Sequence, residues 1–547
     1  MHVSRPTFVF LLIVSFFHSY TCFTQNKVTL DVNNISLTQW EVATIGFNTD
    51  NYSDRFVIAP SGSGLSPMYA AFFWFRGIDI YHENRVFAGY YFNDKLPFTG
   101  PIHHPVLHME DEASFYATYN RSWLVTRAEI DAFKSNRGNA GYIIPEAILS
   151  WPGNGDTTIG VAERLAPYAD ANGDGRYEPL DGDYPIIRGD AAIYQMMNLN
   201  AETGDRYYKK MGLEIHTMIY AYADGPASLL GNTIFVHNTI INREGFDYLE
   251  FQPGLYIDFD LGHYNDDQTG CDSILNLSYV YNGDDYDGPD SLAYGNMIPS
   301  FGIQQLSHPM YACGFNSIDA YLFNGYWYEF QYFMQGFWPL HPANYYDTPF
   351  TYGGSGYNGV TPTKYLFSSP PDDPEGWSME TEGYPPSDRN SMSSSSIVPL
   401  ANGDTLCTEF AMLFAPATIP NDRFHSVNKL FQYAAQLQAM YPALHNGEDC
   451  ITYQKEPWQA NAADGITFLP YPNPSENTIW LNTGPFHHTN LILELRDMTG
   501  KLVARSMFSD ILENQVIAYN LPELSAGQYL LTGKVNGYYF SHLVQVK

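Results

Sequence analysis

The feature that most constrains the fold of this chain is a series of runs rich in β-branched and aromatic residues, each bounded by turn-forming residues. The clearest runs are EIHTMIYAYA (214–223), NTIFVHNTII (232–241) and YLEFQPGLYIDFD (248–260). Such residues fit the pleated surface of a sheet, and the 44 Gly, 35 Pro and 43 Tyr favour strands and turns over helix bundles. The sequence therefore predicts a mainly β fold, with a large β-sandwich-like body that contains few helices.

Two segments carry clear helix signals. Thr126 and Glu129 form a capping box ahead of a short helical turn. Residues 422–441 space their apolar side chains along one helical face, and we expect this helix to stop at Pro442. The serine-rich segment Ser391–Ser396 is predicted to be a loop.

The charge of the chain argues against one class of partner and favours another. The chain has 59 acidic and 27 basic residues, which gives a formal net charge of −32. Binding to nucleic acid needs Lys and Arg against the phosphates, so we expect no nucleic-acid partner. Carboxylate oxygens are instead the ligands that hard divalent cations take.

Residues 1–24 have the parts of a secretory signal peptide. Arg5 precedes the apolar run 7–17, and a polar stretch leads to cleavage after Thr24; lipoprotein cleavage at Cys22 is the alternative. The apolar run is shorter than the roughly 20 residues of a membrane-spanning helix. No other stretch approaches that length, so we expect no transmembrane segment in the mature chain.

Removal of the signal leaves four cysteines, an even number that permits two disulfides in an exported protein. We expect Cys271–Cys313 and Cys407–Cys450, the pairs that lie closest in sequence. Buried free thiols are the alternative. The spacing does not fit a zinc site.

The end of the chain has a different pattern. After the body (25–456) and a polar linker (457–465), residues 466–547 alternate short apolar strands with Gly and Asn turns, which is typical of a small β-sandwich. Particular residues recur in order along this segment: Pro472, Asn473, Pro474, Arg496, Asp497, Gly500, Lys501, Leu524, Gly527, Tyr529 and Lys547.

With these residues, the segment closely resembles the C-terminal sorting domain of the type IX secretion system of Bacteroidetes. The resemblance implies an immunoglobulin-like β-sandwich that the outer-membrane translocon reads during export. The cargo is then released or attached to the cell surface. An ordinary immunoglobulin-like binding module is the alternative.

The body has a looser resemblance. WPGNG (151–155), DANGDGRYEPLDGDYP (170–185) and the segment 258–284 look like stretches of a recurrent secreted Bacteroidetes family that carries the same tail. This resemblance implies export and acidic loops, and it implies no particular activity.

The segment Asp170–Asp181 has the pattern D-x-N-x-D-G with an acid at position 12, which is the spacing of a calcium loop. Position 12 is Asp rather than Glu, and Pro179 and Pro185 prevent a following helix. The loop therefore resembles those of dockerins and thrombospondin type 3 repeats more than an EF-hand. The expected ligands of a structural calcium ion are Asp170, Asn172, Asp174, the carbonyl of Arg176, Glu178 and Asp181. Asp183 and Asp190 can extend the site, and a solvated acidic turn is the alternative.

A second acidic segment, residues 258–290, contains nine Asp and no Lys or Arg. Asp258 and Asp260 share one face of a predicted strand. Together with Asp266 and Asp267 they are candidates for a second cation site, and an acidic surface loop is the alternative. No pair of carboxylates stands out as catalytic, so no catalytic residue is assigned.

Residues 323–359 contain fourteen aromatic residues. As a strand, this segment has Tyr326 and Tyr328 on one face and Trp327 on the other. Exposed aromatic rings stack on sugars, so Trp327 and Trp338 are candidate glycan contacts. Aromatic residues on both faces are also the pattern of a strand buried between layers.

Together these features predict an exported, calcium-stabilised, β-rich protein of the cell surface or the medium. We expect a non-catalytic adhesin, or a component that binds glycan or another surface polymer. A carbohydrate-active hydrolase is the alternative.

Overall fold

The computed structural model describes most of the chain. The expected signal peptide, the linker 457–465 and the Pro472–Pro474 motif lie outside the described residues. The described residues are 27–40, 44–47, 55–89, 97–103, 109–200, 210–317, 327–338, 348–357, 359–445, 450–451, 454–455, 477–482, 489–497, 501–511, 515–535 and 538–547.

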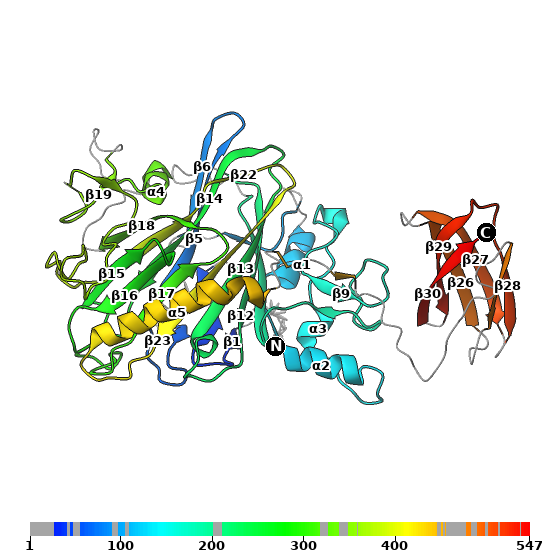
Figure 1. Cartoon of the computed structure of the whole chain (residues 1–547), viewed down its shortest axis with the longest axis horizontal. Coiled ribbons are helices and arrows are strands. Elements are labelled where there is room, and N and C mark those ends of the chain that lie inside the picture. Colours follow the sequence, from blue (N-terminus) through cyan, green and yellow to red (C-terminus); the bar gives the residue numbers. More distant parts are fainter. Residues whose placement is uncertain are drawn as a thin grey trace, which may run out of the picture.

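The body is built on two antiparallel sheets (Figure 1). The large sheet has the strand order β15–β16–β17–β23–β13–β12–β11–β7, with β8 also paired to β11. Its strands are β7 (Phe98–Thr99), β8 (Trp123–Thr126), β11 (Ala191–Asn198), β12 (Leu213–Ala221), β13 (Thr233–Asn242), β15 (Asp267–Asp272), β16 (Leu277–Asn282), β17 (Ser300–Gln305) and β23 (Thr405–Ala415).

The small sheet has the order β18–β21–β14–β5–β3, with β22 beside β14 and β6 beside β5. Its strands are β3 (Thr44–Ile45), β5 (Ala70–Asp79), β6 (Asn84–Ala88), β14 (Tyr248–Phe259), β18 (Met310–Ser317), β21 (Arg389–Ser395) and β22 (Val398–Leu400). Shorter strands form three minor sheets: β1 (Val28–Leu30), β2 (Ser36–Gln39) and β4 (Val57–Ile58); β9 (Tyr168–Asp170), β10 (Tyr184–Pro185) and β24 (Gln454–Lys455); and β19 (Phe350–Thr351) with β20 (Pro362–Thr363).

The two sheets enclose the main hydrophobic core. Trp74 of β5 stacks on Tyr256 of β14, with ring centroids 4.9 Å apart. Side chains of the large sheet alternate between two cores: Ile234 and Val236 of β13 join the main core, whereas Phe235 joins a second core on the opposite face. Strands buried on both faces need apolar residues at successive positions, which explains the nearly continuous runs at 214–223, 232–241 and 248–260. The mainly β fold and these strands are confirmed.

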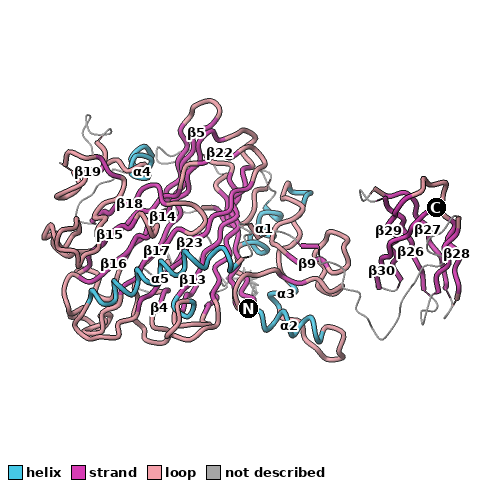
Figure 2. The backbone as a smooth tube through the Cα atoms, viewed as in Figure 1, coloured by secondary structure: helices cyan, strands magenta, loops and turns pink. Residues whose placement is uncertain are grey.

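Helices are few, and Figure 2 shows them lying outside the sheets. They are α1 (Met109–Tyr119), α2 (Arg127–Asn136), α3 (Glu146–Leu149), α4 (Trp327–Met334) and α5 (Arg423–Leu444), with short 3₁₀ turns at Thr157–Ile159 and Leu230–Asn232. The capping box is confirmed, because Thr126 caps α2 and Glu129 reaches back to the Thr126 backbone. Helix α5 packs across β16, β17 and β23 and covers the second core.

The predicted stop of this helix at Pro442 is wrong, because α5 continues to Leu444. Proline removes one backbone N–H and with it one helical hydrogen bond. Only two residues follow Pro442 in α5, so the loss falls in the last turn, where the helix already lacks partners.

The predicted loop at Ser391–Ser396 is also wrong. Residues up to Ser395 lie in β21, between β18 and β14, and the serines of this strand are buried. Their hydroxyls bond to groups far along the chain: Ser391 Oγ lies 2.6 Å from Ser278 Oγ, and Ser394 Oγ donates to the Met334 carbonyl at 2.7 Å. Serine runs form strands where such partners exist, and local sequence does not reveal those partners.

The predicted aromatic strand at 326–333 is a helix, α4, that begins at Trp327. Phe330 and Phe333 of this helix join the main core. Trp338, one of the two candidate glycan contacts, is buried in the same core, and its indole N–H donates to the Gly356 carbonyl at 2.8 Å. The side chain of Trp327 lies outside the described residues.

The C-terminal residues form a separate unit with its own core. β25 (Thr478–Asn482) pairs with β28 (Val516–Asn520), and a second sheet has the order β27 (Leu502–Ile511), β26 (Thr489–Asp497), β29 (Gly527–Val535) and β30 (Tyr538–Val546). Ile479 and Leu481 of one sheet pack with Leu493 and Leu495 of the other. Two antiparallel sheets around one core fit the expected immunoglobulin-like sandwich.

Both expected disulfides are present. Cys271 of β15 bonds to Cys313 of β18, and Cys407 of β23 bonds to Cys450. The first therefore joins the large sheet to the small sheet. The second ties the segment that follows α5 back to the large sheet.

Candidate metal centre

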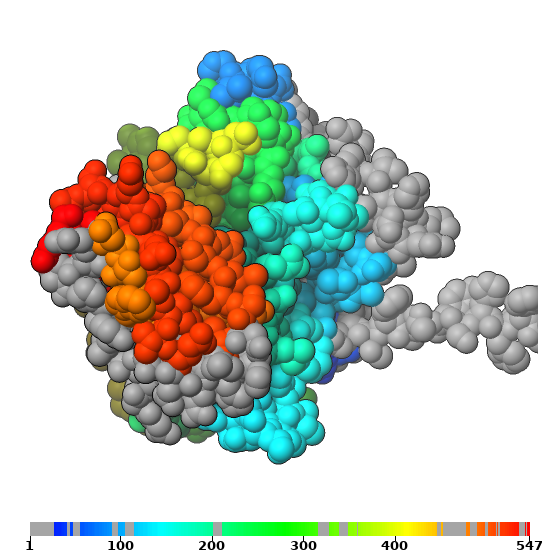
Figure 3. Space-filling view, turned by 90° about the vertical axis from the view of Figure 1, so that its right-hand side faces the viewer, coloured from blue at the N-terminus to red at the C-terminus, as the bar shows by residue number. Residues whose placement is uncertain are grey.

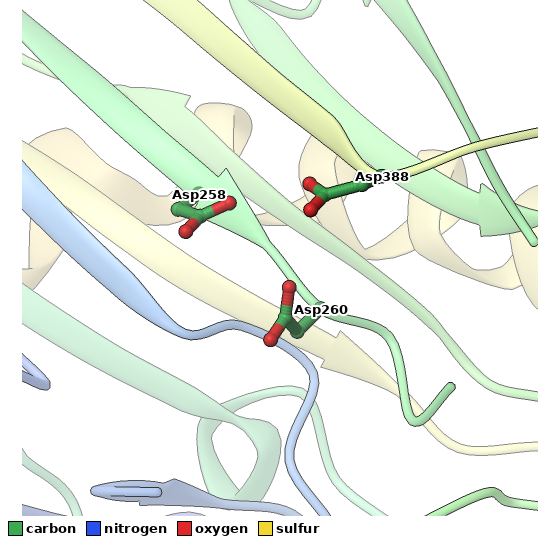
Figure 4. Close-up of side chains that lie close together, drawn as sticks. All are labelled: Asp258, Asp260 and Asp388. Atoms are coloured by element: carbon green, nitrogen blue, oxygen red, sulfur yellow. The ribbon is translucent and has the colours of Figure 1, made fainter. Parts of the chain in front are cut away.

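Three carboxylates meet at one end of the two-sheet body, and we call them the carboxylate centre: Asp258, Asp260 and Asp388 (Figure 4). Each offers one oxygen, and these oxygens lie within 4.8 Å of one another. Figure 4 shows the three side chains pointing toward a common space, two of them from β14 and the residue that follows it. The third precedes β21.

Strand register explains why these three carboxylates lie close together. Asp258 and Asp260 are two residues apart, as expected from the sequence, and Asp258 pairs with Asn390 across β14 and β21. Because the two strands are antiparallel, the end of β14 lies beside the start of β21, where Asp388 is found. Asp388 stands far along the chain from the acidic segment 258–290, so no local pattern links it to this group.

The carboxylates of β14 are removed from water. Asp258 is 5% and Asp260 is 7% exposed. Arg55 donates to Asp260 at 2.8 Å. Burial raises the pKa of Asp260 to about 7, with Asp388 adding to the rise and Arg55 opposing it. Like charges buried together disfavour ionisation unless a cation compensates them.

Further acidic residues surround this centre. Asp267 and Asp287 are fully buried, and burial raises the pKa of both carboxyls. Burial and the neighbouring Asp287 raise the pKa of Asp266 to about 7. By contrast Asp284, Asp285 and Asp290 are exposed. The surface-loop alternative therefore describes the outer part of the segment, and the structure draws Asp258, Asp260, Asp266 and Asp267 inward.

The predicted calcium loop connects β9 to β10, in the projecting part of the body that appears cyan in Figure 3. Asp170 is buried, and its two oxygens accept from the N–H groups of Gly173 and Gly175 at 2.5 and 2.8 Å. Gly175 has a φ of +87°, a conformation that favours glycine. Asn172 and Asp174 each accept from a backbone N–H two residues on.

The loop is closed by Asp183. Its carboxylate is fully buried and accepts from the N–H groups of Ala171 and Glu178, both at 2.8 Å. Burial raises the pKa of Asp183 to about 6, and the neighbouring Asp170 and Asp174 add to the rise. Arg176 and Asp181 are exposed and Glu178 is half-buried. Asp170 and Asp174 thus lie near enough to Asp183 to affect its pKa, although the three carboxylates are not among the described acidic groups whose oxygens lie within 4.8 Å of one another, and Asp181 lies at the surface.

Two buried polar networks on the large sheet were not predicted from the sequence. Glu409 is bonded by Arg188, by Tyr220 and, at 3.0 Å, by His237. Glu214 accepts from Arg243 at 3.0 Å and lies 3.1 Å from His216, which in turn bonds to Tyr194.

Apart from Arg188 and Arg243, which lie between strands, these groups belong to β11, β12, β13 and β23, so cross-strand register brings them together. A signal was present in the sequence, since Glu214, His216 and His237 interrupt apolar strands.

In the C-terminal unit, Arg496 and Asp497 lie on β26, Gly527 and Tyr529 lie on β29, and Lys501 directly precedes β27. Lys501 donates its N–H to Asp497 Oδ1 at 3.1 Å, and Arg496 pairs with Glu494 at 2.7 Å. Gly527 begins β29, Tyr529 donates to the Ser525 carbonyl at 3.0 Å, and Lys547 is exposed. Gly500 lies outside the described residues.

Comparison with known families decides the nature of this unit. Residues 470–545 match the family model described as the secretion system C-terminal sorting domain. The chain carries a type IX secretion sorting domain. This domain indicates export to the cell surface or the medium and interaction with the type IX machinery.

The body is less closely related to known proteins. None of the curated proteins matches the chain. Among solved structures, a polysaccharide lyase aligns with 61% of this chain and 34% of its own length, at 8% identity and a TM-score of 0.18. The chain thus spans about a third of that lyase. None of the helices in the described ranges combines the length and apolar character that a membrane crossing requires.

The Glu214 network predicts a pH dependence of stability. Burial alone would raise the pKa of Glu214, but His216 and Arg243 outweigh it and lower the pKa to about 2. A lowered folded-state pKa adds stability above the unfolded value of about 4.5, and this contribution is lost as the pH falls toward 2. We expect Glu214→Gln to cost about 3 kcal/mol at pH 7 and progressively less below pH 4.5.

Urea unfolding at a series of pH values measures this difference, and the exposed Glu163→Gln is the control. A cost of Glu214→Gln that stays constant between pH 7 and pH 3 would contradict the ionised network.

Proposed function

We propose that this chain is exported through the type IX machinery and acts outside the cell as a non-catalytic, calcium-stabilised component that binds a surface or matrix polymer. The observation that carries the proposal is the sorting domain joined to a body in which the acidic residues Asp258, Asp260, Glu214 and Glu409 are buried. Export is given by the sorting domain. The role of the body rests on the two features below.

The first feature is the burial of carboxyl groups that a hydrolase would need as its acid and base. Hydrolysis of a glycoside needs two carboxyl groups on either side of a sugar ring. Asp258 and Asp260 are 5% and 7% exposed, and Glu214 and Glu409 are fully buried. Carboxyls in such positions favour an internal ion or a structural network over a polysaccharide substrate.

The second feature is the loop between β9 and β10. Asp170 and Asp174 lie near enough to Asp183 to raise the pKa of its carboxyl, and calcium takes carboxylate, amide and carbonyl oxygens of this kind. Asn172 and the carbonyl of Arg176 can complete the set. Extracellular calcium modules bind at about 10⁻⁴–10⁻³ M, so the ion would hold the loop wherever calcium is present at such concentrations.

Export predicts a simple phenotype. Deletion of 466–547 should leave the protein inside the cell, because the translocon would lose the unit that it reads. Immunoblots of cell and medium fractions measure this. Fusion of 457–547 behind a carrier with a signal peptide should export the carrier, and secretion of the truncated chain would contradict the proposal.

The role of the body predicts binding without turnover. We expect the purified chain, incubated with insoluble polysaccharides in the presence of calcium, to be retained on at least one polymer and to release no sugar. Pull-down and a reducing-sugar assay measure the two outcomes. Sugar release would instead favour the hydrolase alternative, and failure to bind any polymer would contradict glycan binding.

Calcium binding by the loop between β9 and β10 predicts that calcium stabilises the folded chain. At 10 mM Ca²⁺ we expect a stabilisation of about 1–3 kcal/mol, which follows from the affinity range above. The double variant Asp170→Asn, Asp183→Asn should lose this effect, whereas Asp181→Asn and the exposed helix variant Asp131→Asn should keep it. Thermal unfolding in calcium and in EGTA measures it, and equal responses of all variants would rule out the loop site.

A further inference from the structure

The outer face of the four-stranded sheet of the sorting domain gathers basic and apolar side chains. In β26 the residues Leu491, Leu493 and Leu495 lie in the core of the sandwich. Successive side chains of a strand point to opposite faces of the sheet, so Glu494 and Arg496 lie on the outer face. The neighbouring strands β27 and β29 extend this face on either side of β26.

Strand register places two further basic residues on the same face. Arg505 of β27 pairs with Glu494, and Lys534 of β29 pairs with Ile492, which lies two residues before Glu494 on β26. Arg505 and Lys534 are exposed, and Arg496 is partly exposed. Among the described side chains on this face the one acid is Glu494, which already pairs with Arg496 at 2.7 Å. We call Arg496, Arg505 and Lys534, with Glu494 between them, the basic face.

The charge of the basic face differs from that of the rest of the chain. Residues 1–465 contain 53 acidic and 22 basic residues, whereas residues 466–547 contain six acidic and five basic residues. Three of these five basic residues lie on the basic face. The outer face of the other sheet carries no charged residue at its described positions, which are Thr478, Trp480, Val516, Ala518 and Asn520. Positive charge is therefore concentrated on one side of the sandwich.

Exposed apolar side chains border the basic residues. Met507 is 64% exposed and pairs with Ile492. Leu502 and Leu530, which are 43% and 36% exposed, both pair with Arg496 from the strands on either side of it. Arg and Met are enriched where proteins contact one another, and an exposed apolar surface marks such a contact.

We propose that the basic face docks the sorting domain on an acidic, partly apolar protein surface of the type IX machinery. The inference rests on export through the sorting domain, because the matched family indicates interaction with that machinery. Positive charge attracts an acidic partner and fixes the orientation of the complex, and the exposed apolar side chains gain free energy when contact buries them. The same acidic partner repels the strongly negative body, so the chain would approach with its sorting domain first.

Export of the full chain tests the basic face. The double variant Arg505→Gln, Lys534→Gln removes two positive charges, and we expect it to lower the exported fraction by about fivefold or more in a host with an intact type IX system. The control Asn520→Glu, Ser525→Glu changes the net charge of the domain by the same amount at exposed positions outside the basic face, and it should be exported normally. Immunoblots of cell, surface and medium fractions measure the difference.

A second variant tests the apolar border of the face. Met507→Ser should also lower export, since it removes apolar surface without changing the charge. Thermal unfolding of each purified full-length variant shows whether the chain is folded. Normal export of the folded double variant and of folded Met507→Ser would overturn the proposal. Deletion of 466–547 separates this failure from a failure of export itself, because the deletion should block export whichever face makes the contact.

Sedimentation with vesicles of anionic phospholipid tests an acidic membrane surface as the partner. Loss of export in the double variant, with no binding of the wild-type chain to these vesicles, supports a protein partner. Vesicle binding that the double variant loses, together with normal export of that variant, would assign the basic face to lipid and overturn the proposal.

Discussion

The burial of the large sheet on both faces is the constraint on which the rest of the body depends. One face meets the small sheet, and the other meets α5 and the segments between α1 and β10. A strand in this position has no side open to water, so a charged or polar side chain on it loses stability unless it gains a partner. His237 of β13 and Glu409 of β23 satisfy this requirement by facing each other across the strands, with Arg188 as a third member. Side chains alternate between the two faces of the large sheet, and this alternation places apolar residues in the two cores and also brings the polar residues of the buried networks together.

The acidic groups at the end of the body where β14 meets β21 have different electrostatic surroundings from those in the buried networks. In the Glu409 and Glu214 networks, the carboxylate is matched by Arg and His, and hydrogen bonds to these groups lower the pKa of both glutamates. At the carboxylate centre Arg55 pairs with Asp260, but burial, with smaller contributions from neighbouring carboxylates, raises the pKa of Asp260 and of the nearby Asp267. Buried acidic groups thus shift in opposite directions, according to whether Arg and His partners outweigh the cost of burying the charge.

Structural features whose cause lies in neighbouring residues could be predicted from the sequence. The β-branched runs and the capping box at Thr126 each depend on neighbouring residues. Prediction failed where distant partners determine the structure. The hydroxyls of β21 are satisfied by groups on other strands and on α4, so Ser391–Ser395 forms a strand rather than a loop. Asp388 reaches the carboxylate centre only through strand register, which a single sequence does not reveal. The disulfides were predicted because the cysteines closest in sequence also lie together in the fold.

The sorting domain and the body contribute to different aspects of the protein. The sorting domain has its own core, formed by Ile479, Leu493 and their neighbours, and it indicates export of the protein. The body contains several buried acidic groups, among them Glu214, Glu409, Asp258 and Asp260. A catalyst must bring its acids and bases to the substrate, whereas a binding protein needs a rigid framework that keeps its surface loops in place. Buried networks such as that of Glu409, Arg188 and His237 supply rigidity of this kind, because they tie neighbouring segments together without occupying the surface.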